Sequence, residues 1–372
     1  MRKAVSYQLS AVSKSLVLQM SSIINNLEEY RANGECSWEL PPYGHPLAQG
    51  IYPLFANADE RLFPLGTAFC FSKLGIVATA EHNIRDALLH HWRGDTLRSM
   101  DKLPESYKLS DVGLTILNHY LEDNSYTGHL WPIENFQGAP PTDLVFGFPN
   151  FQTHFPFLSL PISFAVPRIG SRVFCVGYSD TCLSDSGIQR DDLRFGRSNW
   201  FEAYRYIFRV TRGTVTRIFT QRFSGSFIKG PCFTIDAEVK HGMSGGPVFN
   251  EEGYICGVVS AGATHFFNSP ASIVSLLYPT LLTDIKLGVS IGPLRINGIR
   301  QLVSLIGQGF VITDGSESLV TIRPMNGEIF IGPMIRREDV SFVHDDFSGY
   351  QEGREASRQA KEIYRVFKKE SS

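Results

Sequence analysis

One serine in this 372-residue chain stands in a segment suited to nucleophilic chemistry. Ser244 is the serine of Gly-Met-Ser-Gly-Gly-Pro, residues 242–247, and glycines permit a tight turn in which two backbone amides converge on one oxygen atom. Acyl transfer through a serine needs an exposed hydroxyl, a base that takes its proton, and donors aimed at the developing oxyanion. The segment therefore predicts Ser244 as a nucleophile and the amides of Gly242 and Ser244 as an oxyanion hole.

A histidine upstream is placed to serve as the base. His82 follows the apolar run Ile-Val-Ala-Thr-Ala at 76–80, and a second run, Gly-Thr-Ala-Phe-Cys-Phe, occupies 66–71. Two strands joined near Gly75 would deliver His82 just past a strand end, where it can face a cleft. Of the ten histidines, His82 alone has this context. His241 could line a cleft beside the serine, but it also reads simply as a loop residue.

Two aspartates compete for the third position of a Ser-His-Asp triad. Asp143 and Asp111 both precede strand-like segments. Asp143 lies 61 residues after His82 and 101 before Ser244, whereas Asp111 gives separations of 29 and 133. The well-studied triad of this order has separations of roughly 45 and roughly 93. The spacing therefore favours Asp143, with Asp111 as the alternative.

These segments together resemble the bacterial trypsin-like peptidases. The resemblance rests on Asp-Ala at 236–237, the Ser244 segment, Gly-Val-Val-Ser-Ala-Gly at 257–262 and the Thr-Ala-x-His frame that ends at His82. It covers about residues 60–262 and implies a chymotrypsin-like double β-barrel with a Ser244, His82 and Asp143 triad. Glu81 departs from the family pattern, in which alanine is common at this position.

The same resemblance implies residues that bind the substrate. Ser260, Ala261 and Gly262 resemble the strand edge along which a substrate backbone pairs. Glu238 stands six residues before Ser244, where the family often places the floor of its primary pocket. A buried carboxylate there would favour Lys or Arg side chains of the substrate. A solvent-facing glutamate in a loop is the alternative, and it implies no such preference.

The elements that must position these residues are mostly strands. From about residue 51 to 295, short runs rich in Val, Ile, Phe and Thr alternate with Gly, Pro, Asn and Asp, which indicates many short strands. Such strands close most readily as barrels or sandwiches. We therefore predict an all-β fold, a chymotrypsin-like double β-barrel over 51–295 that divides near 165–200, with helical N- and C-terminal extensions.

The extensions cover residues 1–50 and 296–372. Apolar residues at three- and four-residue steps predict a helix from about 10 to 31, and a Pro- and Gly-rich stretch then predicts a linker. The C-terminal extension contains a hairpin that turns at Asn326-Gly327. It ends in an amphipathic helix whose apolar face holds Ala356, Ala360, Ile363 and Phe367. These extensions either pack on the barrels or dock a regulatory protein partner.

Composition argues against several other classes of protein. The 35 basic and 37 acidic residues leave a net charge of -2, which provides no strong field to recruit nucleic acid. No apolar stretch approaches the roughly 20 residues that span a membrane, and no signal-peptide run follows the basic start. No Cys-x-x-Cys or His-Glu-x-x-His points to a metal, and no cofactor is expected. The six cysteines read as reduced, so we expect a cytoplasmic protein that acts on protein or peptide substrates.

Two other functions fit part of this pattern. A peptidase-like module that binds proteins without turnover would keep the fold, but the presence of all three triad candidates argues against it. An α/β-hydrolase esterase would carry Gly-x-Ser-x-Gly between a strand and a helix, with its histidine last. Here His82 comes first and strands flank Ser244. The sequence therefore predicts a serine endopeptidase that works through an acyl-enzyme intermediate.

Overall fold

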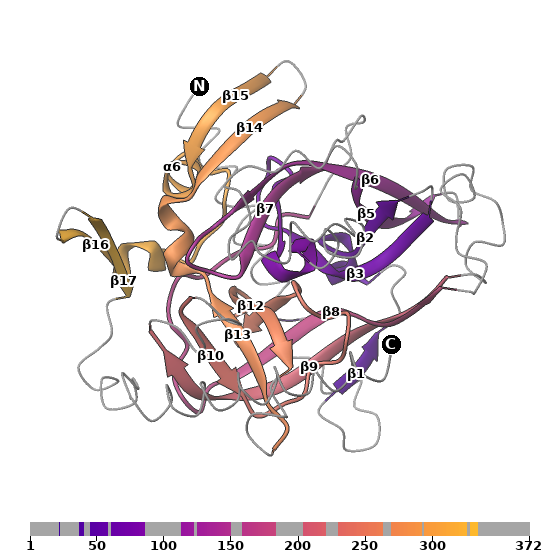
Figure 1. The fold of residues 1–372 in the computed structure, drawn as a ribbon, viewed down its shortest axis with the longest axis horizontal. Helices are drawn as coiled ribbons and strands as arrows, with labels where there is room; N and C mark the ends of the chain where they lie inside the picture. The colour runs from indigo at the N-terminus through magenta and orange to yellow at the C-terminus, as the bar shows by residue number, and fades with distance from the viewer. Residues whose placement is uncertain are drawn as a thin grey trace, which may run out of the picture.

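The structure is a computed structural model, and most of its described residues form strands (Figure 1). Besides Ser22, it describes residues 37–40, 45–58, 61–85, 113–122, 125–149, 158–183, 204–220, 230–262, 269–291, 294–325 and 328–333.

Six antiparallel strands form the first barrel, in the order β2-β3-β4-β7-β6-β5, and the pairing of β2 with β5 closes it. The strands are β2 (Ile51–Ala58), β3 (Arg61–Cys70), β4 (Val77–Ala80), β5 (Gly113–Glu122), β6 (Ser125–Gly138) and β7 (Leu144–Pro149).

Strands β4 and β7, and β3 from Gly66 onwards, are buried on both faces, so apolar residues occupy both faces. Side chains alternate across a strand, so Ala68 and Cys70 point into the first barrel, where they join its interior cluster. Phe69 and Phe71 point outwards and join the larger cluster that also contains the core of the second barrel. The continuous run at 67–71 therefore supplies two cores at once.

A second barrel of six strands follows, in the order β9-β10-β13-β12-β11-β8, and it closes because β8 also pairs with β9. The two barrels lie side by side (Figure 1), and the predicted all-β double β-barrel is confirmed. The strands are β8 (Arg172–Leu183), β9 (Tyr204–Phe219), β10 (Cys232–Ile235), β11 (Pro247–Asn250), β12 (Ile255–Gly262) and β13 (Ser272–Leu276).

The described part of the extensions does not support the predicted helical character. The segments predicted as terminal helices lie outside the described residues, apart from Ser22. The N-terminal extension instead supplies a strand, β1 (Ser37–Leu40), which pairs with β9 and buries Trp38 and Leu40 against the second barrel. Residues two apart lie on the same face of a strand, so Trp38 and Leu40 are buried together. Four residues carry too little pattern for the sequence to predict this strand.

One hairpin lies within the C-terminal extension, and a second one crosses its predicted boundary at residue 296. The hairpin predicted near residue 326 is present, with Met325 of β16 opposite Glu328 of β17. Its strands are β16 (Val320–Met325) and β17 (Glu328–Pro333), and the other hairpin joins β14 (Asp284–Ile291) and β15 (Leu294–Gln301). The remaining elements are the short helix α6 (Leu302–Gly307) and the 3₁₀ turn η5 (Ser316–Leu319).

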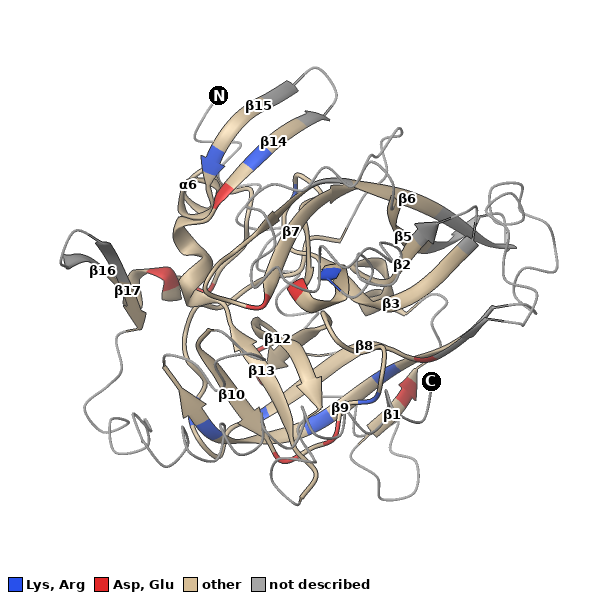
Figure 2. Ribbon diagram, viewed as in Figure 1, with Lys and Arg blue, Asp and Glu red and all other residues tan. Residues whose placement is uncertain are grey.

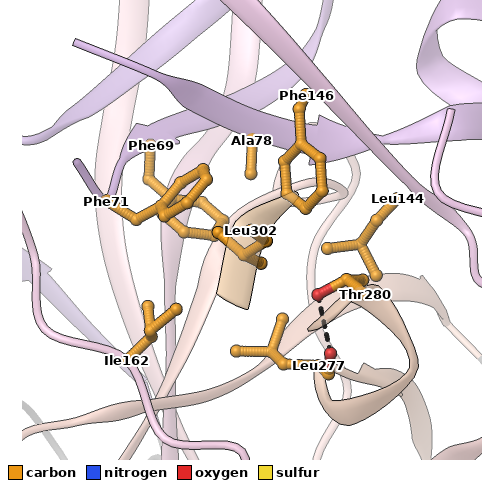
Figure 3. A pocket seen from close by; sticks show the side chains of 9 residues that line it. All are labelled: Phe69, Phe71, Ala78, Leu144, Phe146, Ile162, Leu277, Thr280 and Leu302. Atoms are coloured by element: carbon orange, nitrogen blue, oxygen red, sulfur yellow. Dashed lines mark hydrogen bonds between the residues drawn. The ribbon is translucent and has the colours of Figure 1, made fainter. Parts of the chain in front are cut away.

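A small apolar cavity lies where these late elements pack on the outer face of the first barrel (Figure 3). Thr280, the polar side chain of the lining, donates a 2.7 Å hydrogen bond to the Leu277 carbonyl oxygen (Figure 3), so its hydroxyl is satisfied within its own turn, η4 (Tyr278–Leu282). A cavity with such walls stays dry. Its lining residues are Phe69, Phe71, Ala78, Leu144, Phe146, Ile162, Leu277, Thr280 and Leu302.

The segment that joins the two barrels is hydrogen-bonded to both of them. The Leu160 amide donates to the Cys70 carbonyl oxygen of the first barrel at 2.9 Å. The Ser163 amide donates to the Ile255 carbonyl oxygen of the second barrel at 2.7 Å. Between them, the Ile162 amide donates to the carbonyl of Ile312 in the C-terminal extension. The late part of the chain therefore fastens the joining segment in place.

Charged residues of the two signs are scattered over the described ribbon rather than gathered on one side (Figure 2). This distribution agrees with the small net charge of -2. None of the helices in the described part of the chain is long and apolar enough to span a membrane.

His45 is a buried histidine that the fold holds in its neutral form. Its Nδ1 accepts a 3.3 Å hydrogen bond from the Leu47 amide at the start of the 3₁₀ turn η2 (Pro46–Gln49). Its ring lies against that of Phe208, with 5.9 Å between centroids. Burial lowers the pKa of His45 from 6.5 to about 4, because the charged imidazolium loses its hydration.

We expect acidification from about pH 7 to about pH 5 to lower the free energy of unfolding by on the order of 1–2 kcal/mol through His45 alone. The unfolded chain takes up a proton near pH 6.5 and the folded chain only near pH 4, so acid favours the unfolded state between these values. Urea unfolding at the two pH values measures the loss. His45→Asn keeps an acceptor for the amide but does not titrate, so this variant should lose less; equal losses would contradict the assignment.

Candidate active site

Strand register brings His82 and Asp143 to the same rim of the first barrel. β4 and β7 are antiparallel neighbours, with Ala80 opposite Leu144. His82 comes two residues after the end of β4, and Asp143 directly precedes β7. The Glu81 amide donates to the Asp143 carbonyl oxygen at 3.2 Å, which continues the pairing by one residue. The two side chains that the spacing paired are therefore neighbours in space.

The Asp143 carboxylate fixes the orientation of the His82 imidazole. Its Oδ2 lies 2.8 Å from Nδ1 of His82, and its Oδ1 accepts a 3.0 Å hydrogen bond from the His82 amide. An ionised carboxylate only accepts hydrogen bonds, so in the neutral imidazole Nδ1 carries the proton and Nε2 keeps its lone pair. The Asp143 side chain is 8% exposed and that of His82 30%. The carboxylate is thus buried behind an imidazole that reaches the surface.

Asp111, the alternative to Asp143, lies outside the described residues. The strand that follows it, β5, pairs with β2 and β6, whereas His82 follows β4. Asp143, by contrast, contacts His82 through both oxygens of its carboxylate.

Ser244 lies in the loop that leads from β10 to β11 in the second barrel. On either side of it, Gly242 has a φ of +92° and Gly245 a φ of +84°, values that residues with a Cβ atom rarely adopt. A Cβ at Gly242 would lie 2.7 Å from the Tyr178 carbonyl oxygen, and one at Gly245 would overlap the Thr67 carbonyl oxygen. The loop passes so close to β3 and β8 that only glycine fits at these two positions.

The amides of Gly242 and Ser244 remain unengaged on this loop. Between them, the Met243 amide donates to the Lys240 carbonyl oxygen at 3.1 Å. The Gly245 amide donates to the Val259 carbonyl oxygen at 2.8 Å. Within the described residues, neither the Gly242 nor the Ser244 amide has a hydrogen-bond acceptor. Two N–H groups are therefore available to a ligand oxygen, on the residues predicted as oxyanion donors.

Side chains of the first barrel hold the Ser244 loop, and none of them stood out in the sequence. The Thr67 hydroxyl donates to the Gly242 carbonyl at 2.9 Å, and Asn83 Nδ2 donates to the Ser244 carbonyl at 2.9 Å. In the sequence, Thr67 and Gly242 are 175 residues apart, and Asn83 and Ser244 are 161 residues apart. No local pattern could therefore reveal these contacts. The position of Asn83 directly after His82 is the one signal that the sequence offered.

The strand edge predicted to pair with a substrate is the end of β12. The Ser260 carbonyl accepts a 3.4 Å hydrogen bond from the Ser244 hydroxyl, whereas the Ser260 hydroxyl is buried in a hydrogen bond within the barrel. The pairing of β11 with β12 begins at Pro247. Among the described strands, β11 therefore leaves Ala261 and Gly262 unpaired on that side, and their backbone is the part that could bind a peptide.

Glu238 does not form a buried floor in this structure. Its side chain is 51% exposed and lies 3.9 Å from the ammonium group of Lys240. The Glu238 carboxylate therefore faces solvent, which agrees with the alternative interpretation, a solvent-facing glutamate in a loop. The neighbouring Ala237 carbonyl and Val239 amide are both hydrogen-bonded to the Ser272 hydroxyl, at 2.7 and 2.9 Å, which turns the Glu238 side chain away from the barrel.

We expect Glu238→Gln to change the ratio of kcat/KM for substrates with Arg and Ala before the scissile bond by less than about threefold, because an exposed charge is screened by water and salt. Matched fluorogenic peptides measure this ratio. A tenfold loss of preference for Arg in the variant would instead restore the carboxylate as a determinant of specificity.

The family model of the trypsin-like peptidase domain matches residues 66–258. This match covers more than half of the chain, and the chain belongs to that family. Glu81, which departs from the family pattern, forms a 2.9 Å ion pair with Arg85 one helical turn later. The Glu81 carboxylate is thus paired with Arg85, while the Asp143 carboxylate oxygens accept hydrogen bonds from His82.

Solved structures with detectable similarity include two proteases. The Rv3671c protease from M. tuberculosis in its active form is 15% identical, with a TM-score of 0.38, over 64% of this chain and 82% of that chain. The MamO protease domain from Magnetospirillum magneticum in its apo form is 14% identical, with a TM-score of 0.38, over 62% of this chain and 93% of that chain. No curated protein matches the chain.

Proposed function

We propose that this protein is a serine endopeptidase that cleaves peptide bonds of protein or peptide substrates through Ser244, His82 and Asp143. The observation that carries this proposal is the pair of hydrogen bonds that the Asp143 carboxylate accepts from His82, at 2.8 and 3.0 Å. That pairing leaves Nε2 of His82 as the basic nitrogen. The unengaged amides of Gly242 and Ser244 support it further, because they offer the donors that a tetrahedral oxyanion needs.

The proposed reaction assigns one step to each of these groups. Nε2 of His82 takes the proton of the Ser244 hydroxyl as Oγ bonds to the substrate carbonyl carbon, and the carbonyl oxygen becomes an oxyanion held by the two amides. The C–N bond then breaks, and His82 gives its proton to the departing amine. Water attacks the resulting ester with His82 again as base, which releases the carboxylic acid and returns the proton to Ser244. Asp143 stabilises the imidazolium in both halves of the reaction.

Reaction with a fluorophosphonate probe tests this proposal directly. Ser244 should displace fluoride and become covalently modified, because the same base and oxyanion donors assist attack on phosphorus. Mass spectrometry of the labelled peptide identifies the site, and Ser244→Ala should remain unlabelled. A folded wild-type protein that resists the probe would favour the alternative, a peptidase-like module that binds proteins without turnover.

A further inference from the structure

Thr67 of β3 is the residue through which the first barrel grips the Ser244 loop. Its amide donates to the Ser244 carbonyl at 2.8 Å, and its hydroxyl donates to the Gly242 carbonyl at 2.9 Å. The same hydroxyl accepts a 2.9 Å hydrogen bond from the Tyr178 amide of β8. The Thr67 carbonyl accepts a 2.7 Å bond from the Thr79 hydroxyl. Because Thr67 is fully buried, this network satisfies its polar groups without water.

The two carbonyls that Thr67 holds belong to the residues whose amides are unengaged. Within one residue, two torsion angles separate the N–H from the C=O, so a fixed carbonyl restricts the direction of the amide. Gly242 needs this restraint most, because glycine populates positive and negative φ almost equally. At the other end of the network, Thr79 lies in β4, three residues before His82. Thr67 thus connects the loop of the oxyanion donors to the strand that leads to the base.

The hydroxyl and the amide of Thr67 secure different ends of this loop. The Ser244 carbonyl has two donors, the Thr67 amide and Asn83 Nδ2, and neither depends on the Thr67 side chain. The Gly242 carbonyl is held by the Thr67 hydroxyl. Loss of the hydroxyl alone therefore releases the Gly242 end and leaves the Ser244 end in place.

We propose that Thr67 is a positioning residue, whose hydroxyl keeps the Gly242 amide directed at the oxyanion. The inference rests on the proposed peptidase function, and the hydroxyl acts through the loop rather than by contact with substrate. A preorganised oxyanion hole binds the transition state more tightly than the substrate. Loss of the hydroxyl should therefore lower kcat and leave KM nearly unchanged.

Three variants test this role with a fluorogenic peptide and a peptidyl trifluoromethyl ketone, whose adduct with serine mimics the tetrahedral intermediate. Thr67→Val removes the hydroxyl at nearly constant shape, and Thr67→Ser and Thr67→Ala differ from each other by one oxygen atom. We expect Thr67→Val and Thr67→Ala to lower kcat by about 10- to 100-fold, somewhat less than loss of a whole oxyanion donor. The Ki of the ketone should rise by the same factor, and Thr67→Ser should stay within about threefold of the wild type in both.

The serine and alanine pair keeps the test decisive if Thr67→Val does not fold. Equal kcat values for these two variants would overturn the proposal, and so would a loss that appears in KM or in the melting temperature without a matching change in the Ki of the ketone. A folded wild-type protein that neither cleaves peptides nor reacts with a fluorophosphonate would contradict the proposed function itself. The two failures are thus distinguishable.

Discussion

Replacement of Ser244 by alanine should lower kcat by on the order of 10⁶, the loss measured when the nucleophile of a comparable triad is removed. In the proposed reaction the hydroxyl oxygen bonds to the substrate carbonyl carbon, so the alanine variant lacks the attacking atom. Hydrolysis of a fluorogenic peptide by purified protein measures the effect. KM should change little, because the alanine side chain leaves the β12 edge and the loop backbone intact.

The stability of this variant should match that of the wild type. Among the described residues, the Ser244 hydroxyl makes one hydrogen bond, a long one of 3.4 Å to the Ser260 carbonyl, so its loss costs the fold little. Ser318→Ala provides a matched control, because that exposed hydroxyl lies in η5 and bonds only within its own turn. The control should retain full activity. A Ser244→Ala protein that still cleaved at more than about a hundredth of the wild-type rate would exclude Ser244 as the nucleophile.

Replacement of Asp143 by asparagine should lower kcat by about 10⁴, the effect of the same change in a well-studied triad. The asparagine amide would donate towards Nδ1 of His82 in place of the carboxylate that accepts from it. The imidazole would then carry its proton on Nε2, and it could not take the proton of Ser244. Because asparagine has nearly the same shape, the fold should be retained, as thermal unfolding would verify.

Asp111→Asn is the matched variant for this experiment. We expect it to change kcat by less than about threefold, because both oxygens of the Asp143 carboxylate already contact His82. The reverse result, a loss of about 10⁴ in Asp111→Asn and near-normal activity in Asp143→Asn, would give the third position of the triad to Asp111.

The strands were predictable because burial of one or both faces produces a recognisable pattern of apolar residues in each of them. Alternation and runs of Val, Ile and Phe identified β3, β4, β8 and β12, whose residues are buried on one or both faces. Strand β1 escaped notice because four residues carry too little pattern to distinguish a strand from a linker. The C-terminal elements were only partly predicted: the Asn-Gly hairpin has a local turn signal, whereas α6 owes its place to packing on the first barrel.

The site was predictable as far as its chemistry is local. The glycines around Ser244 and the strand before His82 are short-range patterns. The choice of Asp143 used the order His, Asp, Ser and the separations between these residues in the chain. The role of Thr67 is not local, since it depends on the close approach of two barrels. The orientation of Glu238 also depends on its surroundings, because Ser272, 34 residues later in the chain, fixes the backbone on either side of it.

The proposed base and the proposed nucleophile belong to different barrels, and this division has a consequence for the newly made chain. His82 and Asp143 meet as soon as β4 pairs with β7, within the part of the chain that is synthesised first. Ser244 follows about a hundred residues later, and its loop takes its shape from Thr67 only after the barrels dock. Because domains fold in the order of their synthesis, the growing chain carries a base without a nucleophile. If the proposed function holds, the chain gains peptidase activity only after the second barrel has been made, and it cannot cleave neighbouring nascent proteins before then.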